Sequence, residues 1–254
     1  MGMRAMINDF IAEVDATQTV TALGGALSAM TRRMGYDFFA LTHHVEVQRA
    51  DDAAIRLHNY PDSWVNYFDD HRLAVSDPIH RASQATSIGF RWRDVGRLVV
   101  LTGADRAILA AAREQGIGDG FTVPANVPGE LHGSCSFATS GDRVMPETNI
   151  PLAQLVGAFA FEGARRLRDR RTRRPPVALT DRQRDCLVWI ARGKTDWEVG
   201  RILGLRQDTV VQHIKDARDR YGVSKRTTLL IRALRDGTIS FDDVFSGDHP
   251  HFWG

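Results

Sequence analysis

Seven of the ten residues from 165 to 174 are arginines, and two prolines follow directly at 175 and 176. Clustered like charges repel one another, and two adjacent prolines cannot continue a helix. Residues 171–178 are therefore expected to form an exposed linker. It divides the chain into a front domain of residues 1–170 and a back domain of residues 179–240, followed by a tail of residues 241–254. A solvated charge run that ends a helix is the simpler interpretation of the arginines, and it is compatible with a linker.

The charge differs on the two sides of this linker. Residues 1–164 hold 13 Arg and no Lys against 19 Asp and Glu, whereas residues 175–254 hold 13 basic and 11 acidic groups. Two domains of opposite charge favour two different partners, and the positive sign of the back domain favours nucleic acid.

Composition excludes several classes of protein. With 43% hydrophobic and 25% charged residues, the chain is typical of globular proteins. Its longest stretches without a charge, of 16 and 14 residues, are shorter than the roughly 20 that a bilayer requires, so no membrane segment is expected. Two isolated cysteines, Cys135 and Cys186, fit neither a disulfide framework nor a zinc site. We expect a cytoplasmic protein with no signal peptide, metal or cofactor.

Helical and extended patterns alternate along the front domain. Gly35 and Gly116 end two of the helices, and Pro61 and Pro151 fit the first turns of two others. The expected helices are 20–34, a short one from 61, 104–115 and 150–170, and the expected strands are 36–42, 87–92, 121–127 and 133–139. This mixture predicts a layered α/β domain in which helices cover a sheet.

The last of these helices is apolar over more than one face, because Gln154 is its only polar residue between Leu152 and Phe161. We therefore expect a two-fold dimer joined along it through Val156 and Phe159. In the competing interpretation both residues belong to the core of their own domain.

The back domain has the pattern of a helix-turn-helix unit. Thr180 and Gln183 form a capping box, and four helices are expected at 180–191, 196–203, 207–221 and 227–235. Gly204 precedes the third helix, in which one stripe is expected to be buried: Val210, Ile214, Ala217 and Tyr221. A glycine-containing turn between two short helices is typical of the motif, although a plain helical bundle has the same periodicity.

The later helix of such a unit enters the major groove of DNA. Gln212 and Lys215, on its outward face, suit base edges, whereas Lys194, Arg218 and Arg226 suit phosphates. The full set of expected DNA contacts is Lys194, Thr195, Gln207, Val211, Gln212, Lys215, Arg218 and Arg226.

Five motifs follow one another in the back domain: Leu179-Thr-x-Arg, Cys186-Leu-Val-Trp-Ile-Ala-Arg-Gly-Lys-Thr-Asp-Trp-Glu198, Ile202-Leu-Gly, Thr209-Val-Val-Gln-His213 and Tyr221-Gly-Val-x-x-Arg226. They resemble the DNA-binding domain of LuxR-type regulators over about 60 residues. Arg206 stands where that family usually has a Ser or Thr cap, Val211 where it often has a basic residue, and Gly200 where Ala is common. These departures bear on the DNA target and on helix stability rather than on the fold.

The front domain has a second set of motifs: Tyr60-Pro-x-x-Trp64-x-x-x-Phe68, Asp77-Pro78, Phe90-x-Trp92, Gly116-Ile-x-x-Gly120-x-x-x-Pro124 and Ser136. Taken singly, each has a plain explanation, such as a core aromatic pair or a turn. In their order and spacing they resemble the autoinducer-binding domain of acyl-homoserine-lactone receptors, over roughly residues 20–164.

This resemblance implies a role for each residue. An acyl homoserine lactone offers two carbonyl acceptors and one amide N–H donor. Trp64 would donate to the lactone carbonyl, Asp77 would accept the amide N–H, and Tyr60 and Ser136 would donate to the amide carbonyl. The remaining expected contacts are Phe68, Trp92 and Phe121 in the pocket wall and Ala40 and Thr42 beside the acyl tail. Phe68, where the family usually has Tyr, predicts a more apolar tail region.

Together the resemblances imply an α+β fold class, with an N-terminal α/β/α sandwich around a mainly antiparallel sheet and a C-terminal all-α domain of four helices. They imply a ligand-responsive transcription factor that regulates quorum-sensing genes. Its expected partners are an N-acyl homoserine lactone, a second copy of the chain, operator DNA with an inverted repeat, and RNA polymerase.

Two other functions stay open. A hydrolase using Ser136, Asp77 and a histidine would lack the usual nucleophile-elbow, zinc-protease and P-loop motifs, so no catalytic residue is expected. An orphan regulator of the same architecture would respond to a non-lactone amide or bind DNA without a ligand.

Overall fold

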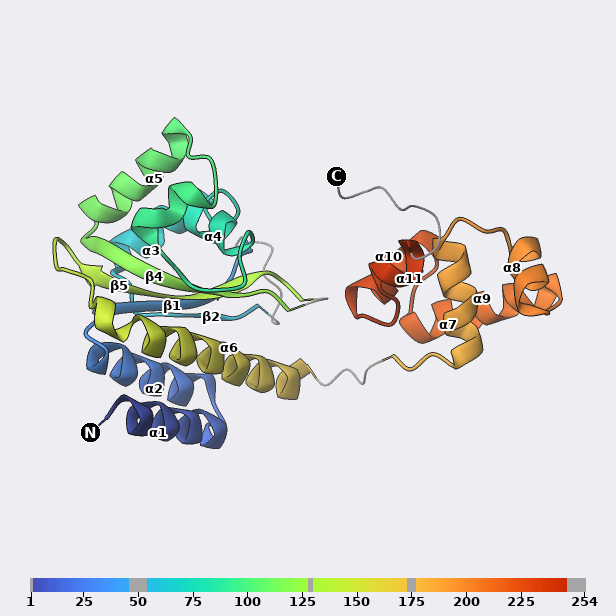
Figure 1. Ribbon diagram of the computed structural model, residues 1–254, viewed down its shortest axis with the longest axis horizontal. Coiled ribbons are helices and arrows are strands. Elements are labelled where there is room, and N and C mark those ends of the chain that lie inside the picture. Colours follow the sequence, from blue (N-terminus) through green and yellow to red (C-terminus); the bar gives the residue numbers. More distant parts are fainter. Residues whose placement is uncertain (1, 46–53, 128–129, 173–176, 246–254) are drawn as a thin grey trace. The chain divides into compact units, whose positions relative to one another are not determined.

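The computed structural model describes residues 2–45, 54–127, 130–172 and 177–245 (Figure 1). The chain divides into two compact units between Arg173 and Arg174, which we call the front unit and the back unit. Residues 173–176 of the expected linker lie outside the described residues. Within the described ranges, every helix is too short or too polar to cross a bilayer.

The front unit is built on one five-stranded sheet in which all neighbouring strands are antiparallel. The strand order is β2-β1-β5-β4-β3, with β1 Phe38–His43, β2 Arg56–His58, β3 Phe90–Arg91, β4 Ile117–Ala125 and β5 Gly133–Ser140. The central strand β5 is buried at seven successive positions, as is usual for a strand that is covered on both faces. The α+β class and the antiparallel sheet are confirmed.

Three helices lie on one side of this sheet (Figure 1): α2 Val20–Arg33 and α6 Ile150–Thr172 pack on the strands, and α1 Met3–Ala16 packs on these two helices. Leu23, Leu27 and Met30 recur at helical spacing on α2 and are buried against the sheet and α6. Gly157 lets α6 approach closely, since a Cβ there would stand 2.8 Å from a methyl group of Val123. α1 was not predicted from the sequence.

The other face carries α3 Asp62–Asp70, α4 Pro78–Ser83 and α5 Gly103–Glu114 (Figure 1). Helices on both faces make the expected α/β/α sandwich. The strand expected at 87–92 is shorter, because the chain leaves β3 for a 3-10 turn at Trp92–Arg97. A second such turn, Glu147–Asn149, precedes α6, and the three-residue β2 was not predicted.

The back unit is all helical, with α7 Asp181–Ala191, α8 Asp196–Leu203, α9 Gln207–Tyr221, α10 Arg226–Arg235 and α11 Phe241–Phe245. Thr180 and Thr195 each begin a helix with a complete capping box. Gly204 has a left-handed φ of 67°, which a glycine adopts without strain, and it turns the chain between α8 and α9. The expected stripe of α9 is buried in the core of this unit: Val210, Ile214, Ala217 and Tyr221.

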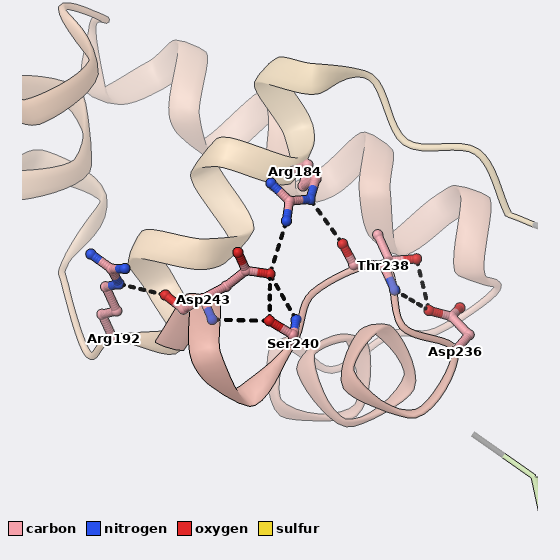
Figure 2. A network of polar contacts seen from close by, with 6 residues as sticks. All are labelled: Arg184, Arg192, Asp236, Thr238, Ser240 and Asp243. Atoms are coloured by element: carbon pink, nitrogen blue, oxygen red, sulfur yellow. Dashed lines mark hydrogen bonds and ion pairs between the residues drawn. The ribbon is translucent and has the colours of Figure 1, made fainter. Parts of the chain in front are cut away.

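The last described segment is ordered rather than a free end (Figure 2). Asp243 of α11 accepts a hydrogen bond from Arg184 Nη2 at 2.8 Å, and its backbone carbonyl accepts one from Arg192 Nε at 2.8 Å. Both arginines lie at α7. The Ser240 hydroxyl caps α11 by accepting from the backbone N–H of Asp243, and the Ser240 N–H donates to the Asp243 carboxylate. Ile239, just before it, is fully buried. We expected a tail from residue 241, but the packed structure continues to Phe245, and residues 246–254 lie outside the described part.

Candidate functional site

A cavity of about 100 Å³ lies between the sheet and the α3–α5 layer. It collects side chains from β1, α3, the loop before α4, the turn after β3, and β5. All the ligand contacts expected from the sequence line it, except Phe121: Ala40, Thr42, Tyr60, Trp64, Phe68, Asp77, Trp92 and Ser136.

Three polar groups of the cavity carry unused hydrogen-bonding capacity. Among the described residues, Tyr60 Oη and Trp64 Nε1 have no hydrogen-bond partner. Asp77 uses its Oδ1 to accept from the backbone N–H groups of Ile79 at 2.6 Å and His80 at 3.2 Å, which caps α4. Its Oδ2 has no partner in the described part of the chain. These three groups give the cavity two donors and one acceptor.

Electrostatics keep Tyr60 protonated. Burial, and then the nearby Asp77 carboxylate, raise the pKa of the Tyr60 phenol well above its usual value of 10. A neutral phenol remains able to donate a hydrogen bond.

A chain of polar contacts runs along the cavity side of the sheet. Trp92 Nε1 donates to Thr122 Oγ1 at 2.8 Å, and Thr122 Oγ1 lies 2.8 Å from Ser136 Oγ. Gly120 makes room for the indole, since a Cβ there would stand 2.7 Å from the Trp92 ring. Thr122 was not among the residues predicted from the sequence. The alternation of β4 would have found it, two residues beyond Gly120 on the same face.

The prediction for Phe121 is wrong because successive residues of a strand point to opposite faces. Thr122 pairs with Ser136 on the cavity face, so Phe121 faces the other layer and packs in the core with Phe137. There it covers Gly89, where a Cβ would stand 2.2 Å from the Phe121 ring.

Sequence reasoning also missed the polar side of the cavity next to β2. Arg56 and Asp69 form an ion pair at 2.7 Å with side chains about one third exposed, and His58 lies beside them. Burial and the Arg56 charge lower the pKa of His58. This end of the cavity is therefore polar, and the apolar tail region expected from Phe68 stays a prediction. Nothing in the sequence marked these residues, because β2 is only three residues long.

Two further histidines pack beside the cavity. The rings of His44 and His80 stack with centroids 3.9 Å apart, and His44 Nε2 lies 2.9 Å from Ser134 Oγ. Burial lowers the pKa of His44 well below 6.5, and the neighbouring His80, His132 and His43 act in the same direction. The described residues contain no group of three side chains arranged to hold a metal ion.

In the back unit, α9 presents four of the residues expected to contact DNA. Gln207, Val211, Gln212 and Lys215 are exposed along its outer side. Gln212 Nε2 donates to Asp216 Oδ1 at 2.6 Å, so its amide is held in place. Arg206, at the N-cap of α9, makes no side-chain cap.

The other four expected contacts have partners within the unit. Arg226 pairs with Asp196 at 2.7 Å, and Arg218 Nη1 donates to the carbonyl of Ser224 at 2.8 Å. The remaining two lie at the start of α8, where Thr195 caps the helix and Lys194 lies 3.9 Å from the Glu198 carboxylate.

Comparison with known families agrees with both halves of this structure. The family model of the autoinducer binding domain matches residues 19–164, and that of the luxR family of bacterial regulatory proteins matches residues 177–233. The chain belongs to the luxR family of autoinducer-binding transcription regulators. Regulation of transcription, DNA binding by the helix-turn-helix and a place in quorum sensing follow from this membership.

Relatives match over most of their length. The transcriptional activator VanR of Vibrio anguillarum is 28% identical over 234 residues, which cover 89% of this chain and 96% of VanR. LuxR of Aliivibrio fischeri is 25% identical over 214 residues, covering 81% of this chain and 82% of LuxR. The crystal structure of SdiA from Escherichia coli has the same fold, with a TM-score of 0.72 at 21% identity over 93% of this chain and 98% of SdiA. A structure of SdiA in complex with octanoyl-rac-glycerol matches with the same TM-score at 20% identity over 94% of this chain and 98% of SdiA.

A family of transcription regulators is not a family of enzymes, so the hydrolase hypothesis is wrong. Ser136 bonds to Thr122 rather than to a histidine. Burial raises the pKa of the neighbouring Cys135 thiol far above its usual value, which also disfavours a nucleophilic thiolate.

Proposed function

We propose that the protein binds an N-acyl homoserine lactone in the cavity of the front unit and, as a dimer, binds operator DNA through its back unit. One observation carries the proposal: the cavity presents donors at Tyr60, Trp64 and Ser136 and an acceptor at Asp77. That set matches the two carbonyl groups and the single N–H of the lactone head.

Each polar group then has one task. Trp64 donates to the lactone carbonyl, and Asp77 accepts the amide N–H through the oxygen that does not cap α4. Tyr60 and Ser136 donate to the amide carbonyl. A hydrogen bond to a charged group contributes about 1.5–3 kcal/mol, so Asp77 is the strongest single contact to the head.

The acyl tail runs from this head over β1. Ala40 and Ser136 are neighbours across the sheet, and Ala40 and His58 are the next pair. The tail therefore crosses the small Ala40 and reaches the edge formed by His58 and the ion pair of Arg56 with Asp69. Thr42, opposite Arg56, lies beside the same end of the cavity. Burial of each tail methylene contributes about 0.8 kcal/mol, so tail length strongly affects affinity.

We infer that two front units join along α6 through Phe159, as the sequence indicated, and through Leu155 in place of Val156. Val156 is fully buried in the core of its own unit, so the competing interpretation holds for it. Leu155 and Phe159 are 45% and 39% exposed and lie one turn apart on the outer side of α6. An apolar pair on the face of a helix that its own core leaves uncovered supports a two-fold contact.

Two back units on such a dimer would contact two half-sites of an inverted repeat, about one DNA turn apart. The exposed side of α9 supports this, with Gln212 and Lys215 directed to bases and Gln207 and Val211 beside them. RNA polymerase as a partner stays a prediction from the resemblance, and the cytoplasm as location stays a prediction from composition and cysteine content.

Ligand capture during expression tests the proposal. The full-length protein is produced with and without a panel of acyl homoserine lactones, and bound molecules are extracted for mass spectrometry. We expect one lactone to co-purify unopened and to raise affinity for an inverted-repeat DNA. Recovery of a different amide, or DNA binding that is equal without any ligand, would favour the orphan regulator instead.

A further inference from the structure

Thr122 links the Trp92 indole to the Ser136 hydroxyl on the cavity side of the sheet. It is fully buried, and its Oγ1 lies 2.8 Å from Trp92 Nε1 and 2.8 Å from Ser136 Oγ. The described residues offer its hydroxyl no third partner. Thr122 and Ser136 stand directly opposite each other on β4 and β5, so the sheet fixes their separation.

The direction of these hydrogen bonds follows from the chemistry of the donors. An indole N–H only donates, so Thr122 Oγ1 must accept from Trp92. The hydrogen of Thr122 then needs an acceptor, and Ser136 Oγ is the one within reach. If Ser136 donated to Thr122 instead, the Thr122 hydrogen would be buried without an acceptor, which folded proteins avoid.

We propose that Trp92 and Thr122 are positioning residues that make Ser136 a hydrogen-bond donor to the ligand. Ser136 lines the cavity and already accepts from Thr122, so its own hydrogen is directed to whatever lies in the cavity. This side of the site therefore selects an acceptor, such as the carbonyl of an acyl amide, and disfavours an N–H at the same place. The inference rests on the proposed function.

The consequence is a fixed orientation of the amide. Asp77 offers the ligand an acceptor, and Ser136 offers a hydrogen that has no other acceptor among the described residues, so the N–H should face Asp77 and the carbonyl should face Ser136. The Trp92 N–H is used within the protein, which leaves Trp64 as the indole available to the lactone. Gly120 contributes indirectly, because it seats the Trp92 ring against β4 at the position that reaches Thr122.

A purely structural role for this chain makes a different prediction. If Thr122 only held the wall of the cavity together, its loss would weaken every ligand equally. A positioning role weakens only ligands that offer Ser136 a strong acceptor. Two probes separate the two roles: N-octanoyl homoserine lactone and its thioamide counterpart, in which sulfur, a weaker acceptor, replaces the amide oxygen.

The experiment measures the binding of both probes to the full-length protein and its variants by titration calorimetry. For Thr122→Val we expect about five- to tenfold weaker binding of the amide and a change of less than about twofold for the thioamide. Thr122→Ser keeps the hydroxyl and should bind both probes like the wild type. Ser136→Ala should match Thr122→Val, and the double variant should be no weaker than Ser136→Ala alone, because both changes remove the same bond.

Trp92→Phe provides a second route if Thr122→Val does not fold. It removes the indole donor and lets the Thr122–Ser136 bond reverse, so the preference for amide over thioamide should shrink. Equal losses of affinity for both probes, or additive losses of affinity in the double variant, would overturn the inference. The proposed binding of the lactone would stand in either case. Failure of the wild type to bind either probe would overturn the proposed function and this inference together.

Discussion

Arg226 and Asp196 form an ion pair, with Nη2 of the arginine 2.7 Å from Oδ1 of the aspartate, that ties the start of α10 to the first turn of α8. The sequence pattern assigned Arg226 to a DNA phosphate, and its contact within the back unit gives it a second task. Arg226→Ala should therefore lower the free energy of unfolding of the back unit by about 0.5–1 kcal/mol and also weaken DNA binding. Urea unfolding and a DNA titration measure the two effects.

Asp196→Asn is the matched control for this pair. It weakens the same ion pair but removes no positive charge from the DNA side, so it should lose stability and keep its affinity for DNA. If Arg226→Ala has the same free energy of unfolding as the wild type, the ion pair does not stabilise the back unit and the arginine acts only in DNA binding.

Lys215 and Arg218 should separate base recognition from folding. Lys215 is exposed on α9, so Lys215→Ala should leave stability unchanged and reduce the preference for specific over random DNA by about 1–3 kcal/mol. Arg218 donates to the Ser224 carbonyl and holds the end of α9 to the following loop, so Arg218→Ala should mainly lower stability. Binding assays on both DNAs would contradict this if Lys215→Ala lost affinity for each to the same extent.

Asp77 caps α4 and is also proposed to contact the ligand, and two substitutions distinguish these two roles. Asparagine is as good an N-cap as aspartate, so Asp77→Asn should keep α4 while weakening lactone binding by about tenfold or more. Asp77→Ala should weaken binding as well and also lower the unfolding free energy by about 1 kcal/mol. A dissociation constant that is unchanged in Asp77→Asn would remove Asp77 from the binding site.

Substitution by a charged residue should have different effects at the exposed and at the buried apolar residues of α6. Leu155→Glu and Phe159→Glu are expected to give folded, lactone-binding monomers, because both side chains are exposed. Val156→Glu is expected to unfold the front unit, because it places a charge in a closed core. Val144→Glu, exposed and outside α6, is the control that should stay dimeric. Circular dichroism and sedimentation decide the matter, and dimers of the Leu155 and Phe159 variants would rule out this interface.

His44 should make the front unit sensitive to acid. Its pKa is lowered in the folded protein, so the unfolded chain takes up a proton near pH 6.5 that the folded chain does not. The contribution of His44 to the free energy of unfolding is therefore complete above that pH and decreases as the pH drops below it, by roughly 1 kcal/mol at pH 5.5.

Urea unfolding at pH 7.5 and pH 5.5 measures this loss. On acidification, the free energy of unfolding of His44→Gln should fall by about that much less than that of the wild type. Ser134→Ala removes the hydrogen-bond partner of His44 but keeps the titrating ring, so it should retain the full loss. Equal acid sensitivity of His44→Gln and the wild type would show that other groups cause it.

The elements with a strong periodic pattern could be predicted from the sequence, and the weak ones could not. The capping box of Thr180 and the stripe of α9 lie where the pattern indicates. The strand β2 is too short to show any alternation, and that hid the cavity residues Arg56 and His58. Phe121 was assigned by residue type, whereas its neighbour Thr122 has the orientation that reaches the cavity.

Val156 shows a different limit of sequence reasoning. A helix that is apolar on several faces does not reveal which face its own domain covers, because that depends on the partners that pack against it. Gly157 brings α6 close to Val123, and this approach buries Val156 and leaves Leu155 outside.

The anchoring of α11 on α7 affects how this DNA-binding module can be transplanted. The match to the family model of the luxR family ends at residue 233, before Ile239 and Asp243. A chimeric regulator cut at that point would lose a buried isoleucine and the carboxylate that holds Arg184, and would leave two arginines of α7 without their counterparts. A graft that keeps the chain through Phe245 retains the contacts that anchor α11 on α7. The boundary suited to domain exchange therefore lies a dozen residues beyond the end of the family-model match.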